Sequence, residues 1–183
     1  GDKINFLDIT DSLVKEDTVQ GILDLAGGGF TLGTLVASTS GTAITFGSIP
    51  TGTTMIVISL NKVSFSANVD LDVTIGDAGG LETSGYLSGS VVSDGVGGGG
   101  FSESTAEWAI NMNGLGNDIC GTITLTLMDA GTYLWAQSHA AASMTTNNWS
   151  FAGGGAKALS AELTQVSISG GTFDLGSINI MYQ

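Results

Sequence analysis

Hydrophobic and polar residues alternate along most of this chain with a period of two. The stretch VDLDVTI, Val69 to Ile75, places its four apolar side chains on one side and Asp70, Asp72 and Thr74 on the other. The stretch TITLTL, Thr122 to Leu127, repeats the same alternation. Successive side chains of a β-strand point to opposite faces, so this period predicts half-buried strands.

The same pattern predicts a series of further strands. They are Thr34–Ser38, Ala43–Phe46, Thr54–Leu60, Val63–Ser66, Gly85–Val92, Glu107–Met112, Thr132–Gln137, Asn148–Phe151, Leu159–Ile168 and Ser177–Tyr182. Turn residues separate them. Two stretches resist assignment: DGVGGGGF from Asp94 is typical of a glycine loop, and SHAAASMTTNN from Ser138 fits either a strand with a wide loop or a helical turn. Short strands at this spacing predict an all-β fold, either a sandwich or a barrel, and we favour an antiparallel β-sandwich of jelly-roll or Greek-key type.

The last predicted strand has the pattern of a buried strand although it ends the sequence. Ile178, Ile180 and Tyr182 are spaced two apart, whereas terminal residues are usually frayed and polar. We therefore expect this strand to complete a sheet near the centre of the domain or at a subunit contact, with Ser177 and Asn179 facing away from the core.

The first 29 residues differ from the rest, and we treat them as an N-terminal anchoring or oligomerisation segment in front of a β-sandwich domain at 30–183. They hold six of the 17 acidic residues among apolar ones. The candidates for anchoring are Ile4, Phe6, Leu7, Ile9, Leu13 and Val14. Asp17 and Gln20 have the spacing of a capping box, and a helical face of Val19, Ile22, Leu23 and Ala26 follows. A short amphipathic helix is predicted there, docked on its own domain, on a neighbouring subunit or on another protein.

Charge excludes several classes of function. Seventeen acidic residues face four lysines and no arginine, which gives a formal net charge of −13. Nucleic acid and anionic membranes would repel such a chain, and the missing arginine argues against phosphoryl transfer. No apolar run approaches the roughly 18 residues of a membrane span. Because 42% of residues are hydrophobic and only 11% are charged, we expect apolar surface that sister copies cover.

Residues that could carry catalysis or bind metal have no supporting pattern. Cys120 and His139 are the single cysteine and histidine, and each occupies a position typical of a core residue. Asp70 and Asp72 share one face of a strand, where alternation predicts solvated side chains more readily than a calcium site. Glycosidases need two carboxylates in a cleft, and no spacing singles out a pair among Glu103, Glu107, Asp129 and Glu162. We expect no enzymatic activity, no cofactor and no bound metal.

Aromatic residues offer a better candidate for binding. Trp149 is flanked by Asn147 and Asn148 in the sequence TTNNWS. An indole face can stack on a sugar ring while the amides bond to hydroxyls, so these three residues are candidates for a glycan or receptor contact. The alternative is that Trp149 belongs to the core or to a subunit contact.

Several longer segments resemble a known module. They are ASTSGTAITFGSIPTGTTMIVISLNKVSFS (Ala37–Ser66), IGDAGGLETSGYLSGS (Ile75–Ser90), GTITLTLMD (Gly121–Asp129), KALSAELTQVSIS (Lys157–Ser169) and FDLGSINIMYQ (Phe173–Gln183). In this order and spacing they resemble the C-terminal β-sandwich module of tailed-bacteriophage tail fibres and related virion appendage and decoration proteins. The resemblance spans roughly Leu32 to the end, and it implies a β-sandwich that assembles as a trimer and contacts the host surface.

The resemblance therefore predicts a non-enzymatic virion structural protein, fibre- or appendage-like, displayed on the particle and contacting the host. The alternative is a capsid decoration (cement) protein that stabilises the phage head, and a weaker one is an unattached adhesin or lectin. We expect a homotrimer that is joined to other virion proteins, of the capsid or tail, through its N-terminal segment. The predicted location is the virion, after synthesis of a small free-standing protein in the host cytoplasm, since the start lacks a signal-peptide pattern.

Overall fold

The structure is a computed structural model that describes residues 3–8, 13–18, 29–94, 99–112, 118–145 and 149–183. The chain divides into two compact units. One comprises Gly1–Thr31 with Gln183, and the other, which we call the sandwich unit, comprises Leu32–Tyr182.

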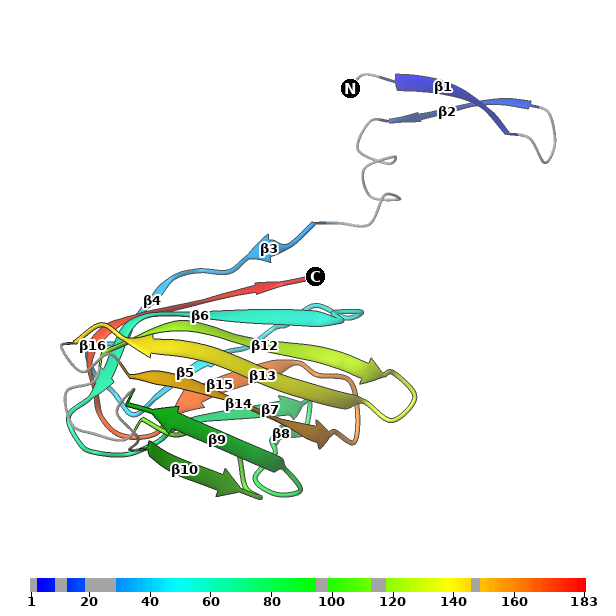
Figure 1. Cartoon of the computed structure of the whole chain (residues 1–183). Coiled ribbons are helices and arrows are strands. Elements are labelled where there is room, and N and C mark those ends of the chain that lie inside the picture. The colour runs from blue at the N-terminus through cyan, green and yellow to red at the C-terminus, as the bar shows by residue number, and fades with distance from the viewer. Residues whose placement is uncertain (1–2, 9–12, 19–28, 95–98, 113–117, 146–148) are drawn as a thin grey trace. The chain divides into compact units, whose positions relative to one another are not determined.

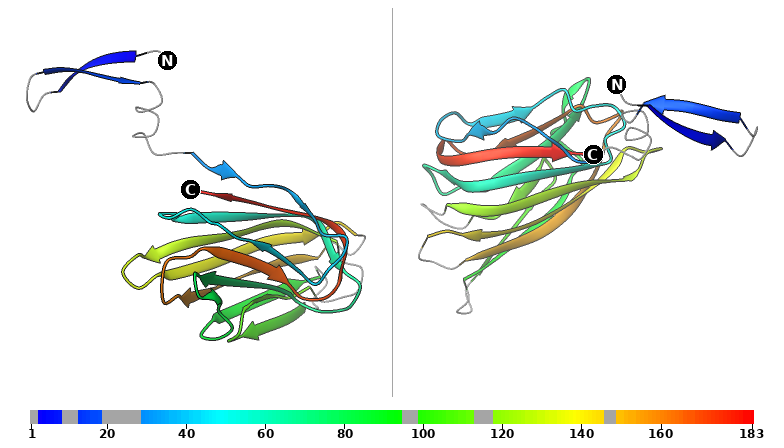
Figure 2. Two further views of the ribbon diagram at one scale, coloured as in Figure 1. Left: turned by 180° about the vertical axis from the view of Figure 1, so that it is seen from behind. Right: turned by 90° about the horizontal axis from the view of Figure 1, so that it is seen from above.

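Two sheets account for most of the described residues, and they form separate layers in Figures 1 and 2. The larger sheet has the spatial order β10 (Gly99–Ser104), β9 (Leu87–Ser93), β14 (Ser150–Ala158), β13 (Leu134–Ser143), β12 (Ile119–Asp129), β6 (Met55–Phe65), β16 (Phe173–Tyr182) and β3 (Thr31–Leu32), with β4 (Val36–Ala37) also on β16. The smaller sheet has the order β11 (Trp108–Ile110), β7 (Leu71–Asp77), β15 (Gln165–Ser169) and β5 (Ala43–Phe46), with β8 (Gly80–Leu81) on β7. From β10 to β16, and throughout the smaller sheet, neighbouring strands are antiparallel.

One hydrophobic core lies between the two sheets. Both sheets contribute to a single cluster of buried residues, among them Ile58 and Trp135 from the larger sheet and Val73 and Trp108 from the smaller one. Burying alternate side chains of each strand explains why the period of two dominates the sequence. The all-β, sandwich-like prediction is confirmed.

Most predicted strands are present, with altered boundaries. Thr54–Leu60 and Val63–Ser66 were expected as separate strands but are parts of one strand, β6. A β-bulge joins them: Lys62 has a φ of 54°, the register against β12 shifts there, and the Lys62 N–H donates to Cys120 Sγ at 3.2 Å. The ambiguous SHAAAS stretch is strand, as part of β13, and the glycine-rich stretch from Asp94 ends in β10.

The prediction for Leu159–Ile168 is wrong in its first half, because only Gln165–Ser169 is strand. Leu159 and Leu163 are buried from a loop, so their apolar side chains gave the loop the pattern of a strand.

The N-terminal unit contains a hairpin. β1 (Lys3–Asp8) and β2 (Leu13–Thr18) pair antiparallel, with Leu7 opposite Val14 and Ile4 opposite Asp17. The predicted helix is wrong at its start, because Asp17, its proposed cap, lies within strand β2, where backbone pairing with β1 takes precedence over the capping signal. The rest of the predicted helix, residues 19–26, lies outside the described residues. Within the described ranges no helix occurs, and hence none that could cross a membrane.

The C-terminal strand packs as its pattern predicts. β16 lies between β6 and β4, with Ile180 opposite Ile58. Ile178 and Ile180 are buried and Tyr182 is half-buried against the core. The end of the sandwich unit is therefore part of the larger sheet and its core.

Candidate functional site

The candidate glycan contact is described in part. Trp149 precedes β14, is half-buried and packs against the core, and its carbonyl accepts the Ser143 N–H at 2.9 Å. Asn147 and Asn148 lie outside the described residues. A contact between Trp149 and a sugar therefore stays a prediction, and part of the indole is already occupied by core packing.

Five of the six candidate anchoring residues lie in the strands of the N-terminal hairpin. Ile4, Phe6 and Leu7 lie in β1, and Leu13 and Val14 lie in β2. Ile9, the remaining candidate, lies outside the described residues. The hairpin brings the two apolar stretches side by side along the backbone, and their role in anchoring stays a prediction.

The single histidine lies in a buried polar cluster. His139 Nε2 is 3.0 Å from Ser90 Oγ and its Nδ1 is 2.9 Å from Gln137 Nε2, while Ser90 Oγ accepts the Asn111 N–H at 3.0 Å. The order Ser–His–Gln superficially resembles a catalytic triad. However, Ser90 is 1% exposed and His139 6%, and a neutral amide stands where a carboxylate would be needed.

Burial lowers the pKa of His139 to about 4, which makes it a weak base. The cluster therefore holds a neutral imidazole in the core and offers no nucleophile to a substrate.

Three of the four carboxylates that were considered for catalysis, Glu107, Asp129 and Glu162, accept hydrogen bonds within the fold. Glu107 accepts the Ser104 hydroxyl, and Glu162 accepts the Gly52 N–H at 2.6 Å. Asp129 caps the β12–β13 turn by accepting the Gly131 N–H and a hydroxyl, contacts that lower its pKa. These bonds give each carboxylate a structural role.

The carboxylate pair of Asp70, just before β7, and Asp72, within β7, differs from expectation. Asp70 and Asp72 are half-buried rather than freely solvated, and burial together with the carboxylates of Glu107 and Asp70 raises the pKa of Asp72 to about 7. Within the described part of the chain, no group of three or more His, Cys, Asp or Glu side chains could hold a metal ion.

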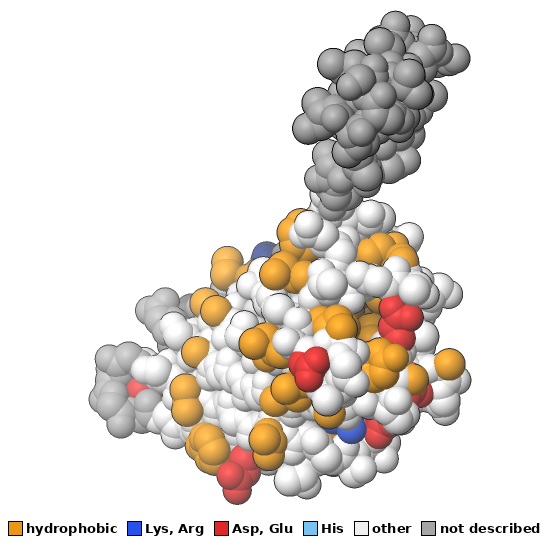
Figure 3. Space-filling model, turned by 90° about the vertical axis from the view of Figure 1, so that its right-hand side faces the viewer, with side chains coloured by type: hydrophobic (Ala, Val, Ile, Leu, Met, Phe, Trp, Pro, Cys, Tyr) orange, Lys and Arg blue, Asp and Glu red, His pale blue; other side chains and the backbone are white. Residues whose placement is uncertain are grey.

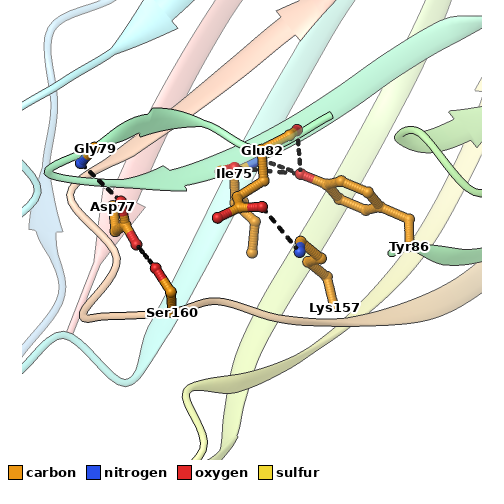
Figure 4. A network of polar contacts seen from close by, with 7 residues as sticks. All are labelled: Ile75, Asp77, Gly79, Glu82, Tyr86, Lys157 and Ser160. Carbon is orange, nitrogen blue, oxygen red and sulfur yellow. Dashed lines mark hydrogen bonds and ion pairs between the residues drawn. The ribbon is translucent and has the colours of Figure 1, made fainter. Parts of the chain in front are cut away.

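A buried ion pair fastens the β8–β9 connection to β14, a feature that sequence reasoning missed. Lys157 points into the core from β14 and is 7% exposed, with its Nζ 3.3 Å from Glu82 Oε2 and 5.4 Å from the ring centroid of Tyr86 (Figure 4). The Tyr86 hydroxyl accepts the Ile75 N–H at 2.9 Å and donates toward the carbonyl oxygens of Ile75 and Glu82, each 3.2 Å away.

Asp77 completes the polar contacts at this end of the sandwich unit (Figure 4). Its carboxylate accepts the Ser160 hydroxyl at 2.6 Å and the Gly79 N–H at 2.7 Å, and these bonds hold its pKa below the ordinary value. The contacts join two loops and leave no free group for chemistry, so this network is structural.

Beside the ion pair lies an open cavity of about 570 Å³. It is lined by Tyr86, Leu87, Ser88, Glu103, Ser104 and Thr105. Glu103 is the one charged side chain among these lining residues, so the lining holds no pair of carboxylates of the kind that a glycosidase needs.

The most distinctive surface is the outward side of the larger sheet. Three cross-strand rows run along it, and we call them together the outer face. The first row is Phe101, Val91, Ala152, Ala140, Thr122, Ser59 and Asn179; the second is Glu103, Gly89, Gly154, Ser138, Thr124, Val57 and Met181; the third is Leu87, Ala156, Ala136, Thr126 and Met55.

The outer face is almost free of charge. Its one charged side chain, Glu103, lies on the edge strand β10. The middle of the face carries Ala, Gly, Ser and Thr, and Leu87, Val91 and Phe101 are 69%, 51% and 61% exposed at one end. On the side of the molecule that Figure 3 shows, hydrophobic side chains are scattered over the described surface, and several acidic side chains lie among them. Alternation predicted the outward positions, but the order of strands that aligns them into a face was not readable from the sequence.

Comparisons with protein-family models, with curated proteins and with solved structures found no match to this chain.

Proposed function

We propose that this chain is a non-enzymatic structural protein of a bacteriophage particle, fibre- or appendage-like, displayed on the particle surface and contacting the host surface. The observation that carries the proposal is the outer face, a broad neutral sheet surface on a chain with a net charge of −13. Exposed faces of this kind mark contacts between proteins. The segments that resemble tail-fibre modules add the identity of the particle.

The division of the chain supports the same proposal. A hairpin unit precedes a larger β-sandwich unit, which suits a protein that is attached by one part and displays the other. Glu107, Asp129 and His139 are held in hydrogen bonds within the fold, which suits a binding or assembly role better than catalysis. We assign the sandwich to the jelly-roll or Greek-key type, because the chain passes between the sheets from β6 to β7 and from β15 to β16.

Electron microscopy with gold-labelled antibody against this chain tests the proposal on particles of the virus that encodes it. We expect label at the tail or its appendages. Label spread over the head would instead support the decoration protein, and particles lacking the chain should then burst at a lower temperature. Absence of label from intact particles, with the protein found free in infected cells, would overturn both.

Contact with the host has its own test. Purified protein should bind host cells saturably, and Trp149→Ala should weaken this binding without changing the fold. Equal binding by the variant would remove Trp149 from the contact. Tyr133→Ala provides a control, because Tyr133 is also an aromatic residue partly buried against the core.

A further inference from the structure

We infer that the outer face is covered by a second copy of this chain. The inference rests on the proposed function insofar as it names the partner of the surface that supports that function.

The charges favour an identical copy over a different protein. A partner of another sequence could use positive charge to bind this acidic chain, and its contact surface here would then be expected to carry carboxylates. A second copy brings the same excess of acidic residues, so any carboxylate left in the contact would face like charge. The three rows of the outer face contain one carboxylate, that of Glu103 at the edge of the sheet.

Lysines cannot supply the missing attraction between two copies. Of the four lysines, Lys3 and Lys15 belong to the N-terminal hairpin, and Lys157 is buried against Glu82. Lys62 alone is exposed on the sandwich unit, at the bulge of β6 and outside the three rows. Two copies must therefore meet through neutral surface.

The shape of the face suits packing against another sheet. Gly89 and Gly154 are paired across β9 and β14, with Ala152 and Ala140 in the next row, so the centre of the face carries short side chains. A Cβ on Gly89 would lie 3.8 Å from the Phe101 ring, which places this ring over β9. A flat centre with larger apolar groups at one end matches the face-to-face packing of sheets, which stack about 10 Å apart.

The area is sufficient for a specific contact. Seven strands about 4.8 Å apart and three rows about 6.8 Å apart define roughly 600 Å² per copy, or about 1,200 Å² in total. This value lies at the lower limit of specific protein interfaces, about 1,200–2,000 Å². Association should therefore be reversible and concentration-dependent.

Sedimentation equilibrium of the purified full chain tests the inference with a matched pair of variants. Ala140→Glu places a carboxylate at the centre of the outer face, and Ala43→Glu makes the same change at an exposed strand position of the smaller sheet. We expect the wild type and Ala43→Glu to associate to a whole multiple of 18.4 kDa, and Ala140→Glu to associate at least a hundredfold more weakly. Circular dichroism and thermal melting check that all three are folded.

An Ala140→Lys variant distinguishes loss of the contact from loss of folding, because it can be mixed with Ala140→Glu. Copies that meet through this face should associate better when Ala140→Lys and Ala140→Glu are mixed than when either is alone. Should Ala140→Glu fail to fold, Thr124→Lys and Thr124→Glu provide the same test one row away.

A monomeric wild type at 100 µM would overturn the inference, and so would equal weakening by Ala140→Glu and Ala43→Glu, or no weakening by either. These results concern the purified chain alone. The purified chain could prove monomeric while microscopy still finds the protein on particles. Failure of the inference and failure of the proposed function are therefore distinguishable.

Discussion

The buried ion pair gives an unequal prediction for its two partners. Replacing Glu82 with Gln removes the carboxylate and leaves the Lys157 ammonium uncompensated in the core. At 3.3 Å and an effective dielectric constant of about 20, the attraction between the two charges is about 5 kcal/mol. Glu82 keeps 30% of its side chain exposed, so water screens part of this energy. We expect Glu82→Gln to lower the free energy of unfolding by about 2–3 kcal/mol.

Replacing Lys157 with Met should cost far less, because this change removes the desolvated charge along with the attraction. The Met side chain can also lie against the Tyr86 ring, whose centroid is now 5.4 Å from Lys157 Nζ. We expect a change within about 1 kcal/mol of the wild type in either direction.

Urea unfolding at pH 7, followed by tryptophan fluorescence, measures both variants at a protein concentration held constant. In a thermal melt of the same variants, Glu82→Gln should lower the melting temperature by about 4–12 °C, and Lys157→Met should change it little. The double variant should match Lys157→Met, because no charge would remain to be left unpaired. Equal losses for the two single variants would refute the reasoning, since the buried ammonium would then not be the source of the cost.

Four further predictions test the packing, the buried titratable groups and the C-terminal strand. Gly155→Ala should destabilise the fold by about 3 kcal/mol or more in thermal melting, because its Cβ would lie 2.0 Å from a backbone carbonyl oxygen and 2.7 Å from the Trp108 ring. The control is Gly47→Ala, whose Cβ would meet nothing within 4 Å and which should be tolerated. Because the pKa of Asp72 is raised, its contribution to stability is present below about pH 4 and is lost as the pH rises through about 7. Asp72→Asn should therefore be more stable than the wild type by about 1–2 kcal/mol at pH 8, and the two proteins should be equally stable at pH 4. The lowered pKa of His139 has the opposite sign: its contribution is present above about pH 6.5 and lost as pH falls toward 4, so urea unfolding of His139→Asn should show a flatter pH profile in that window. Deleting residues 177–183 should abolish folding, because it removes most of the pairing of β16 with β6 and two buried isoleucines. Loss of soluble protein measures this effect. A folded, soluble truncation would show that this part of β16 is dispensable.

The sequence predicted those parts of the fold that depend on local alternation. β5 was predicted residue for residue, and the buried side chains of β7 and β16 were predicted from their spacing alone. Boundaries were missed where a contact distant in the sequence decides them. Asn61 and Lys62 interrupt the run of predicted strand, so two strands were expected, but β12 runs alongside and the bulge at Lys62 keeps β6 continuous.

The glycines of β14 show another limit. A run of three glycines is usually typical of a loop, yet Gly153, Gly154 and Gly155 lie within a strand. A Cβ on Gly153 would lie 2.6 Å from the His139 ring, and one on Gly155 would lie 2.7 Å from the Trp108 ring. These glycines leave room for bulky residues that come from other strands. Such a requirement cannot be read from the local sequence.

The candidate site was less accessible to sequence reasoning than the fold. Trp149 was selected as an aromatic residue between amides, and the structure places part of it against the core. The outer face consists of residues such as Ala140, Ala152 and Ser138, each of which is unremarkable alone. They form a surface only because β9, β14, β13 and β12 are neighbours, an order that depends on pairings across up to about seventy residues of sequence.

The distribution of charge also determines which contacts two copies can make. Acidic residues occupy the rim of the larger sheet, with Asp129 at the end of β12, Asp174 near the start of β16 and Glu103 on β10. Two copies that approach rim to rim therefore repel each other, whereas the neutral outer faces can meet without this cost. Salt screens the repulsion of the rims and leaves apolar packing intact, so raising the ionic strength from about 20 mM to 300 mM should strengthen association. An interface held by salt bridges would weaken over the same range, so the sign of the salt dependence distinguishes the two kinds of contact.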